Sequence, residues 1–300
     1  MLKLYYFKSA DGVPNFGDDL NPWLWRQLLG DFLASESDTI LSGIGTLLNE
    51  RFPRARRTLV FGSGVGLGSG IPRIDDTWTF YCVRGPLSAQ ALGLPASVAV
   101  TDPALFVANL LPKETAEPRH RFSYMPHYRN ANDHWAAVCR MLGFGYVDPR
   151  MPMELVLDGI RSSHVLLTEA MHGAIVADAL GVPWIPVRTA GAGTVEFKWR
   201  DWCESLSLSY RPHRVVPIFA ASTSEMRLTM KKGLAAAQLS WLSRTARPQL
   251  SDAGLRTQRL EQLHDRLERL KRDLERERST GPRMSHHRAG DGTPALMFHR

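Results

Sequence analysis

The chain has few cysteines and lacks the common motifs for a structural metal or a nucleotide phosphate. Its 300 residues include three cysteines, Cys82, Cys139 and Cys203, too widely spaced to form metal-ligand pairs and odd in number for a disulfide framework. We therefore expect a reduced, cytoplasmic protein. The glycine-rich segment 62–70 fits neither the G-x-G-x-x-G fingerprint nor the P-loop pattern, which excludes a standard dinucleotide or P-loop site.

Long hydrophobic runs are also missing. The most apolar region, Val165 to Val187, contains Glu169, His172 and Asp178, whereas a membrane-spanning helix needs about 20 mostly apolar residues. The first eight residues predict a β-strand and not a signal peptide. The net charge of +7 favours anionic partners such as phosphates, sugar phosphates, lipid headgroups or nucleic acid. We expect no nucleic-acid partner, because basic and acidic residues are interleaved and no recognition motif is present.

Short apolar runs alternate with segments of helical periodicity over the first 218 residues. This alternation predicts an α/β protein with parallel, doubly wound sheets. A break rich in proline and charge lies at 112–121, so we expect an N-terminal Rossmann-like domain over 1–112 and a C-terminal one over 119–218. Ligands of such folds bind outside the carboxyl ends of the strands, which places a cleft there. The strand-like runs are Leu2–Phe7, Thr39–Leu41, Thr58–Phe61, Thr77–Val83, Ser97–Val100, Arg121–Met125, Gly145–Val147, His164–Leu167 and Trp184–Val187.

The C-terminal third has a different character. Residues 222–245 predict a helix that packs back on both domains. Residues 250–278 predict an amphipathic helix with a coiled-coil-like leucine seam of about two heptads. This seam fits either a helix packed on its own protein or the interface of a homodimer through 260–274. Residues 279–300 have no periodicity, and we expect a disordered tail. The leucines of the seam are Leu260, Leu263, Leu267, Leu270 and Leu274.

Four polar or glycine-rich motifs follow expected strands, and each has a structural and a functional interpretation. Asp18, with Asn15 before it, is either a helix cap or a carboxylate that holds or deprotonates a sugar hydroxyl. The Gly62-Ser63-Gly64 turn is either flexible or a cradle for an anion. Arg84 suits a salt bridge or a grip on a carboxylate or phosphate. Asp102 is either a turn-forming residue or part of the site.

His172 is the most distinctive candidate catalytic residue. It follows the strand-like run 164–167 and opens a helix, so its side chain is expected at the cleft, beside helix N–H groups that attract anions. Histidine both gives and takes protons near neutral pH. A lone histidine is more often structural, and the surrounding pattern favours a catalytic role here.

Taken together and in order, these motifs resemble the polysaccharide pyruvyl transferase family over about residues 1–215. The early Asn-Phe-Gly-Asp-Asp-Leu-Asn-Pro-Trp stretch is most similar to the branch of bacterial exopolysaccharide assembly, such as the succinoglycan ketal-pyruvyl transferases. The matching pieces are Asn15-Phe-Gly-Asp18, Gly43-Ile-Gly45, Phe61-Gly-Ser-Gly64, Val83-Arg84-Gly85 with Ser88, Thr101-Asp-Pro-Ala104, Met171-His172-Gly-Ala174, Ala179-Leu-Gly-Val-Pro183 and Phe197-Lys-Trp-Arg-Asp201.

The resemblance implies two Rossmann-like halves in a GT-B-like arrangement and phosphoenolpyruvate as donor. A sugar diol would become a cyclic pyruvate ketal, phosphate would leave, and no metal or other cofactor would be needed. Arg84 matches the family arginine that grips the donor, and His172 the histidine of Arg-Leu-His-Gly. The family arginine two residues before that histidine is replaced by Ala170, preceded by Glu169, which we place in the substrate site. The further substrate-binding candidates are Arg129 and Arg188, for the missing charge, and Lys198, on the acceptor side.

The family implies an oligosaccharide acceptor, and assembly at the inner membrane face would make it lipid-linked and the enzyme peripheral there. One alternative is a GT-B glycosyltransferase with a nucleotide-sugar donor, which would share the fold. Another is a non-enzymatic assembly or membrane-surface scaffold that uses the leucine seam and the basic excess.

Overall fold

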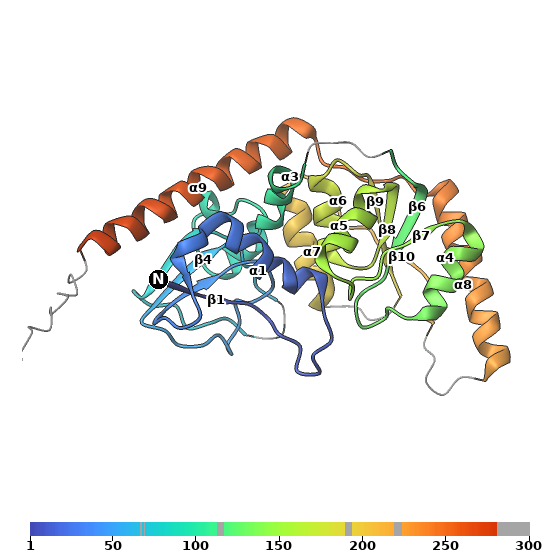
Figure 1. Ribbon diagram of the computed structural model, residues 1–300, viewed down its shortest axis with the longest axis horizontal. Helices are drawn as coiled ribbons and strands as arrows, with labels where there is room; N and C mark the ends of the chain where they lie inside the picture. The colour runs from blue at the N-terminus through green and yellow to red at the C-terminus, as the bar shows by residue number, and fades with distance from the viewer. Residues whose placement is uncertain (67, 69, 113–116, 190–193, 219–223, 281–300) are drawn as a thin grey trace, which may run out of the picture.

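The computed structural model describes residues 1–280 except 67, 69, 113–116, 190–193 and 219–223. It contains two parallel five-stranded sheets, one in each half of the molecule (Figure 1). This confirms the α/β class and the two sheets expected from the alternating pattern. Part of the expected linker, 113–116, lies outside the described residues.

The first sheet has the order β2-β1-β3-β4-β5. Its polar loops follow the strands at one edge, which is where the sequence placed the first half of the site. The strands are β1 Leu2–Tyr5, β2 Leu33–Ala34, β3 Thr39–Ser42, β4 Arg57–Phe61 and β5 Trp78–Cys82; the helices of this half are α1 Phe16–Leu29, α2 Pro86–Ala91 and α3 Val107–Leu110, with 3-10 turns η1 Gly30–Phe32, η2 Ala96–Val98 and η3 Pro103–Phe106.

The strand expected at 97–100 is wrong. Pro95 begins a turn there, in which its carbonyl accepts a hydrogen bond from the Val98 N–H, and the chain forms η2 instead. Only an isolated parallel bridge between Val83 and Ala99 extends the sheet at this point.

The second sheet has the order β10-β9-β8-β6-β7. Local signals fix its helices: the Asn132 side chain caps α4 by accepting from two backbone N–H groups, and Gly143 ends α4 with φ 67°. The strands are β6 His120–Met125, β7 Gly145–Tyr146, β8 Ser163–Thr168, β9 Trp184–Arg188 and β10 His213–Arg214; the helices are α4 Asp133–Leu142, α5 Met153–Arg161, α6 Met171–Ala179 and α7 Thr194–Ser205.

The two halves share one continuous buried core. Phe16 and Leu20 of α1 and Phe106 of η3 belong to the same cluster as Ala174 and Ile175 of α6. Helix α6 therefore packs directly on the first half, although its strand lies in the second. The expected cleft is largely filled by these side chains, because both helices carry apolar residues toward one another.

Helix α8, Glu225–Thr245, packs on α4 in the second half (Figure 1). The prediction that this helix packs on both domains is therefore wrong. Its buried residues Ala235, Ala236, Leu239 and Leu242 join the cluster that contains Trp135 and Val138 of α4. One apolar face of α8 thus has its partner within a single half.

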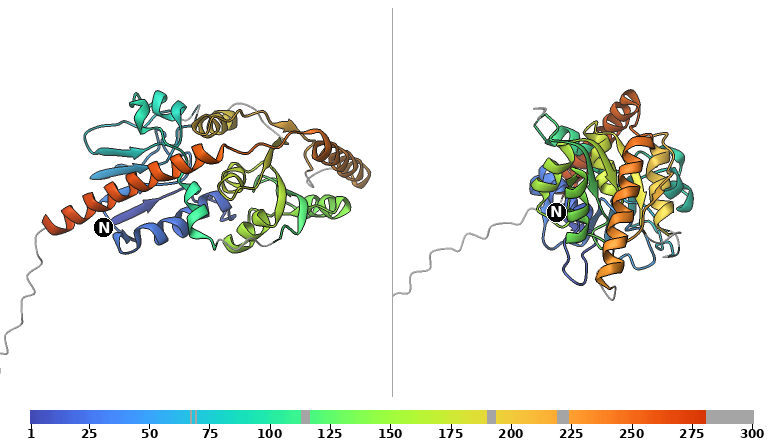
Figure 2. Two further views of the ribbon diagram at one scale, coloured as in Figure 1. Left: turned by 90° about the horizontal axis from the view of Figure 1, so that it is seen from above. Right: turned by 90° about the vertical axis from the view of Figure 1, so that its right-hand side faces the viewer.

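Helix α9, Ala253–Thr280, is the element that returns to the first half, where it runs along the sheet (Figures 1 and 2). Leu263, Leu267, Leu270 and Leu274 are at most 5% exposed, and the Tyr81 hydroxyl of β5 donates to Asp273 at 2.8 Å. The leucine seam is covered by the chain's own first half, which is the first of the two interpretations of this seam; a homodimer through 260–274 stays a prediction. Apart from residues 279 and 280, which end α9, the expected tail lies outside the described residues.

Among the described residues, no helix combines the length and apolar character needed to cross a membrane.

Candidate functional site

A small cavity of about 40 Å³ lies where the two halves meet. It sits between the N-terminal ends of α1 and α6, beside α7, on the side where β6 and β8 end. Both helix N-termini present backbone N–H dipoles that favour an anion. The lining residues are Asn15, Phe16, Gly17, Met125, His127, Tyr128, Pro149, Ala170, Met171, His172 and Lys198.

His172 faces Asp102 across the boundary between the halves. The Nε2 atom of His172 lies 3.6 Å from Oδ2 of Asp102, and the carboxylate is completely buried. Neither of these two atoms has a hydrogen-bond partner within the described part of the chain. The other oxygen, Oδ1, accepts from the Ala104 N–H and so caps η3. Burying a polar atom without a hydrogen-bond partner costs free energy of folding. A role in proton transfer would account for these two unpartnered atoms.

Gly17 allows His172 to occupy this position. A Cβ atom on Gly17 would overlap Nδ1 and the ring of His172. The first turn of α1 therefore lies directly against the imidazole, which also brings Asp18 near it.

Asp18 is half-buried at the start of α1. Burial raises the pKa of its carboxyl, and the charges of His172 and Lys198 oppose this shift. The Asn15 side-chain amide donates to Oδ2 of Asp18 at 2.5 Å. Asn15 and Asp18 are thus joined by a hydrogen bond at the start of α1, and Asp18 is also linked electrostatically to the histidine.

Lys198 enters the cavity from α7. Burial and the positive charge of Arg84 together lower its pKa to about 8, and the charge of Asp18 opposes the shift. The ammonium is therefore protonated at neutral pH but is held close to its titration point. The sequence placed Lys198 on the acceptor side; the structure brings it to the same cavity as His172.

His127 is a cavity residue that the sequence analysis missed. Burial and the charge of Lys198 lower its pKa to about 4, so its imidazole is neutral at neutral pH. A signal was present, because the turn Pro126–Asn130 follows β6 at the strand end that faces the site. Arg129 was the residue predicted from this turn, whereas in the structure His127 lines the cavity.

Arg84 does not line the cavity. Its side chain is completely buried, and Nε lies 2.9 Å from Oδ2 of Asp201 on α7. The other two nitrogens donate to the Thr46 hydroxyl and the Val65 carbonyl. The Asp201 carboxylate also accepts from the backbone N–H and the hydroxyl of Ser88. The structure therefore supports the salt-bridge interpretation of Arg84. The guanidinium of this residue is not exposed and cannot contact the donor substrate in this conformation.

The glycine turn at 62–64 uses its N–H groups within the protein. The Gly62 N–H donates to Cys82, the Gly64 N–H to Gly45, and the Ser63 hydroxyl bonds that of Ser42. Gly62 has φ 85°, and a Cβ atom there would overlap Pro103. A Cβ atom on Gly64 would overlap the Arg84 guanidinium. The glycines provide space for neighbouring protein groups, and the anion-cradle interpretation lacks free donors at Gly62 and Gly64.

The remaining site candidates lie around the cavity without lining it. Glu169 accepts four hydrogen bonds, from the N–H and hydroxyl of Thr189, the His127 N–H and the Asn130 amide. This carboxylate ties the ends of β6, β8 and β9 together. Arg129 is exposed and stacks on Tyr128, and Arg188 ends β9. Lys198 is the lysine or arginine that lines the cavity together with Ala170.

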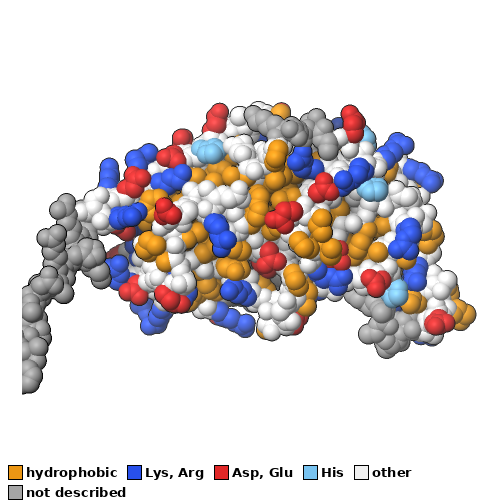
Figure 3. Space-filling model, in the orientation of Figure 1, with side chains coloured by type: hydrophobic (Ala, Val, Ile, Leu, Met, Phe, Trp, Pro, Cys, Tyr) orange, Lys and Arg blue, Asp and Glu red, His pale blue; other side chains and the backbone are white. Residues whose placement is uncertain are grey.

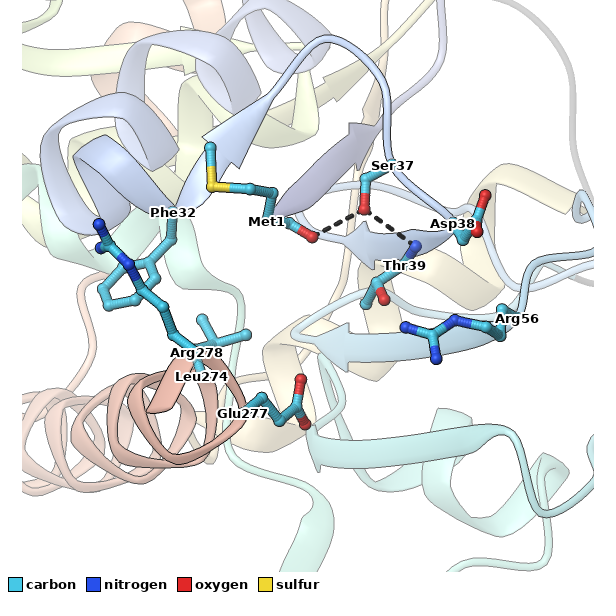
Figure 4. A pocket seen from close by; sticks show the side chains of 9 residues that line it. All are labelled: Met1, Phe32, Ser37, Asp38, Thr39, Arg56, Leu274, Glu277 and Arg278. Carbon is cyan, nitrogen blue, oxygen red and sulfur yellow. Dashed lines mark hydrogen bonds between the residues drawn. The ribbon is translucent and has the colours of Figure 1, made fainter. Parts of the chain in front are cut away.

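A larger cavity of about 420 Å³ lies between the end of α9 and the edge of the first sheet (Figure 4). Two hydrogen bonds join residues of its lining: the Ser37 hydroxyl donates to the Met1 carbonyl and accepts from the Thr39 N–H. None of the expected site residues lines it. The described residues also contain no group of three or more His, Cys, Asp or Glu that could hold a metal ion.

Two parallel α/β halves thus meet at a junction that holds a His–Asp pair and a lysine. The model of the polysaccharide pyruvyl transferase family matches residues 5–190, and the chain belongs to this family. It is similar to the succinoglycan biosynthesis protein ExoV of Rhizobium meliloti (strain 1021). The two are 41% identical over 218 residues, which cover 71% of this chain and 68% of the relative.

Proposed function

We propose that the protein transfers the pyruvyl group of phosphoenolpyruvate to two hydroxyls of one sugar in an exopolysaccharide repeat unit. The family supports pyruvyl transfer to a polysaccharide, and the similarity to a succinoglycan biosynthesis protein supports an exopolysaccharide acceptor. The observation that carries the proposal is the pair of unpartnered buried atoms, His172 Nε2 and Asp102 Oδ2. His172 lines the cavity together with Lys198, and Asp102 lies behind His172.

The reaction needs one proton delivered to carbon and two removed from hydroxyls. The first sugar hydroxyl adds across the enol double bond: its oxygen bonds to C2 and a proton reaches C3. The second hydroxyl oxygen then displaces phosphate from C2, and its proton leaves with the phosphate. A positioned imidazole contributes about 10²–10⁴-fold to such transfers, and His172 is placed to act as this group.

Asp102 would stabilise the imidazolium form of His172 and fix the ring, because its free oxygen faces Nε2. Lys198 and the N–H groups at the start of α6 would hold the anionic donor. Asp18, oriented by Asn15, would accept a hydrogen bond from an acceptor hydroxyl. Arg84 would act indirectly, by fixing the helix that carries Lys198.

The cavity is small, at about 40 Å³. The proposal therefore includes a movement of side chains or of the two halves that widens the site when phosphoenolpyruvate and a sugar bind.

The test is incubation with phosphoenolpyruvate and candidate oligosaccharides, followed by mass spectrometry for the added pyruvyl mass and by measurement of released phosphate. His172→Ala and Asp102→Asn should each lower turnover by about 10²-fold or more. The control is His164→Ala, which changes an exposed histidine on β8 and should leave turnover unchanged. Turnover of both site variants within a few-fold of the unmodified enzyme would reject the assignment.

Thermal unfolding distinguishes this reaction from glycosyl transfer. Phosphoenolpyruvate should raise the melting temperature, as any ligand of the native state does, and nucleoside diphosphates should not. Stabilisation by a nucleotide sugar alone would support the glycosyltransferase alternative.

A further inference from the structure

Helix α8 has a second apolar face that nothing in the described part of the chain covers. Met226, Met230, Leu234, Ala237 and Trp241 recur at spacings of four, four, three and four, which places them on one side of the helix. The four large side chains among them are 72%, 68%, 52% and 60% exposed, in that order. We call these five residues the α8 stripe. The opposite side of α8 packs on α4, and the right-hand view of Figure 2 shows α8 running across the outer end of the molecule.

Basic residues flank the α8 stripe. Arg227, Lys231 and Arg244 lie beside it on the helix, which has one acidic residue, Glu225. Lys232 lies on the packed side of the helix, in line with Ala235 and Leu239. The outer end of the second half in Figure 3 shows orange side chains together with blue, red and pale blue ones. Such a combination of exposed apolar side chains with basic flanks is typical of helices that lie in the headgroup region of a bilayer.

A cavity beside α8 is likewise lined by basic and apolar side chains. Its volume is about 490 Å³, and Arg121 and Arg244 line it together with Phe122, Leu142 and Phe144. Met141, the residue before Leu142, is 64% exposed. Two guanidinium groups next to apolar walls match a phosphate headgroup and the first part of its acyl chains.

We propose that α8 binds an anionic phospholipid bilayer, with the α8 stripe inserted among the headgroups and the basic residues in contact with lipid phosphates. Charge decides between a bilayer and a second copy of the chain. Two copies paired through this face would bring two basic helices together, whereas an anionic surface attracts each Lys or Arg near it. An exposed Trp on the stripe also fits the membrane interface, where Trp is enriched.

The experiment is flotation of the full-length protein with vesicles of phosphatidylglycerol and phosphatidylcholine, compared with vesicles of phosphatidylcholine alone. The protein should float with the anionic vesicles only, and binding should weaken as salt rises. The stripe variant, Met230→Ser with Leu234→Ser, should reduce binding by about tenfold or more. The lysine variant, Lys231→Gln, should reduce it by about fivefold, since one basic residue near an anionic surface contributes about 1 kcal/mol. Leu155→Ser is the matched control, because Leu155 is 55% exposed on α5, and it should bind as the unmodified protein does.

Trp241 supplies a readout of insertion. It is the only one of the eight tryptophans, all within the described residues, that is exposed. Brominated lipids should quench part of the tryptophan emission on binding, and Trp241→Phe should abolish that quenching. Melting curves of all variants establish that they are folded. The substituted side chains are exposed, or half-buried in the case of Lys231, and their loss should leave stability within about 0.5 kcal/mol.

Three results would overturn the proposal: no flotation with anionic vesicles, flotation that the stripe and lysine variants do not reduce, or a dimer in sedimentation that the stripe variant dissociates. The last would assign the stripe to a second copy. Binding is measured without donor or acceptor, so its failure leaves the proposed reaction intact. Turnover of the stripe variants on a soluble oligosaccharide should equal that of the unmodified enzyme.

Discussion

Lys198 illustrates how a single residue can be tuned by its surroundings. Its ammonium is desolvated beside His172 and close enough to Arg84 to be repelled by the guanidinium, and these effects lower its pKa to about 8. Above that pH the folded protein loses the positive charge, while the unfolded chain keeps it up to about pH 10.4. The charged form is therefore costly to fold at neutral pH, and this cost falls as pH rises from about 8 to 10.4.

The first prediction concerns the pH dependence of donor use. Because Lys198 should hold the anionic donor only while protonated, kcat/KM for phosphoenolpyruvate should fall as pH rises through about 8. Lys198→Arg retains its charge at these pH values, so the fall should move to higher pH or disappear. The measurement is kcat/KM from pH 6 to 10 for both proteins, with buffers matched in ionic strength. Identical profiles would show that Lys198 does not hold the donor.

Helix α7 is the element on which the two halves meet. It connects β9 and β10 of the second sheet, but Asp201 accepts from Arg84 and Ser88 of the first half, and the hydroxyls of Thr101 and Ser205 are hydrogen-bonded at 2.9 Å. Gly85 permits this approach, because a Cβ atom there would overlap the Asp201 backbone. The motifs at 83–88 and 197–201 are thus partners of one another.

The second prediction follows from the burial of this ion pair. Arg84→Ala leaves Asp201 as a buried charge without its partner, so the free energy of unfolding should fall by about 3–5 kcal/mol. The double variant Arg84→Met with Asp201→Leu should recover most of the loss. Urea unfolding measures both, and Arg140→Ala, on the exposed side of α4, is the control. A loss below about 1 kcal/mol for Arg84→Ala would contradict a structural role and would support the interpretation that Arg84 binds the donor substrate.

At the scale of the whole molecule, the C-terminal chain connects both halves. After α8 packs on the second half, residues 247–250 pass the edge of β9 through a bridge between Trp184 and Gln249. Helix α9 then covers the first half, where His264 lies against Phe106 and Glu277 pairs with Arg57. Movement of the halves that admits substrate must therefore also strain or carry α9.

The third prediction tests whether α9 is part of the fold or a tether. Leu267→Ala removes a side chain that is 2% exposed within the core, so stability should fall by about 2–5 kcal/mol. Sedimentation should be unchanged, because the seam faces its own chain. Glu268→Ala, on the exposed side of the same helix, is the control. Unchanged stability together with a shift in oligomeric state would instead support the coiled-coil interpretation.

Local patterns were enough for part of this structure. The alternation of apolar runs and helical periods predicted nearly every strand of both sheets, since side-chain periodicity is a local property. Short edge strands such as β2 and β10 carried too few residues for a pattern. The position of His172 after β8 followed from the same alternation, because strand ends of a parallel sheet meet at one edge. Asn15 and Asp18 interact because they share one helix start.

The amino-acid sequence by itself determined two parallel α/β halves, the histidine at a strand end and the apolar seam of the last helix. Only the tertiary structure decided which residues each of these features contacts. Arg84 and Asp201 are 117 positions apart, His172 and Asp102 are 70 apart, and the seam could have met any apolar surface. Burial and ion pairing between such distant residues depend on how the halves pack, and no local periodicity records that packing.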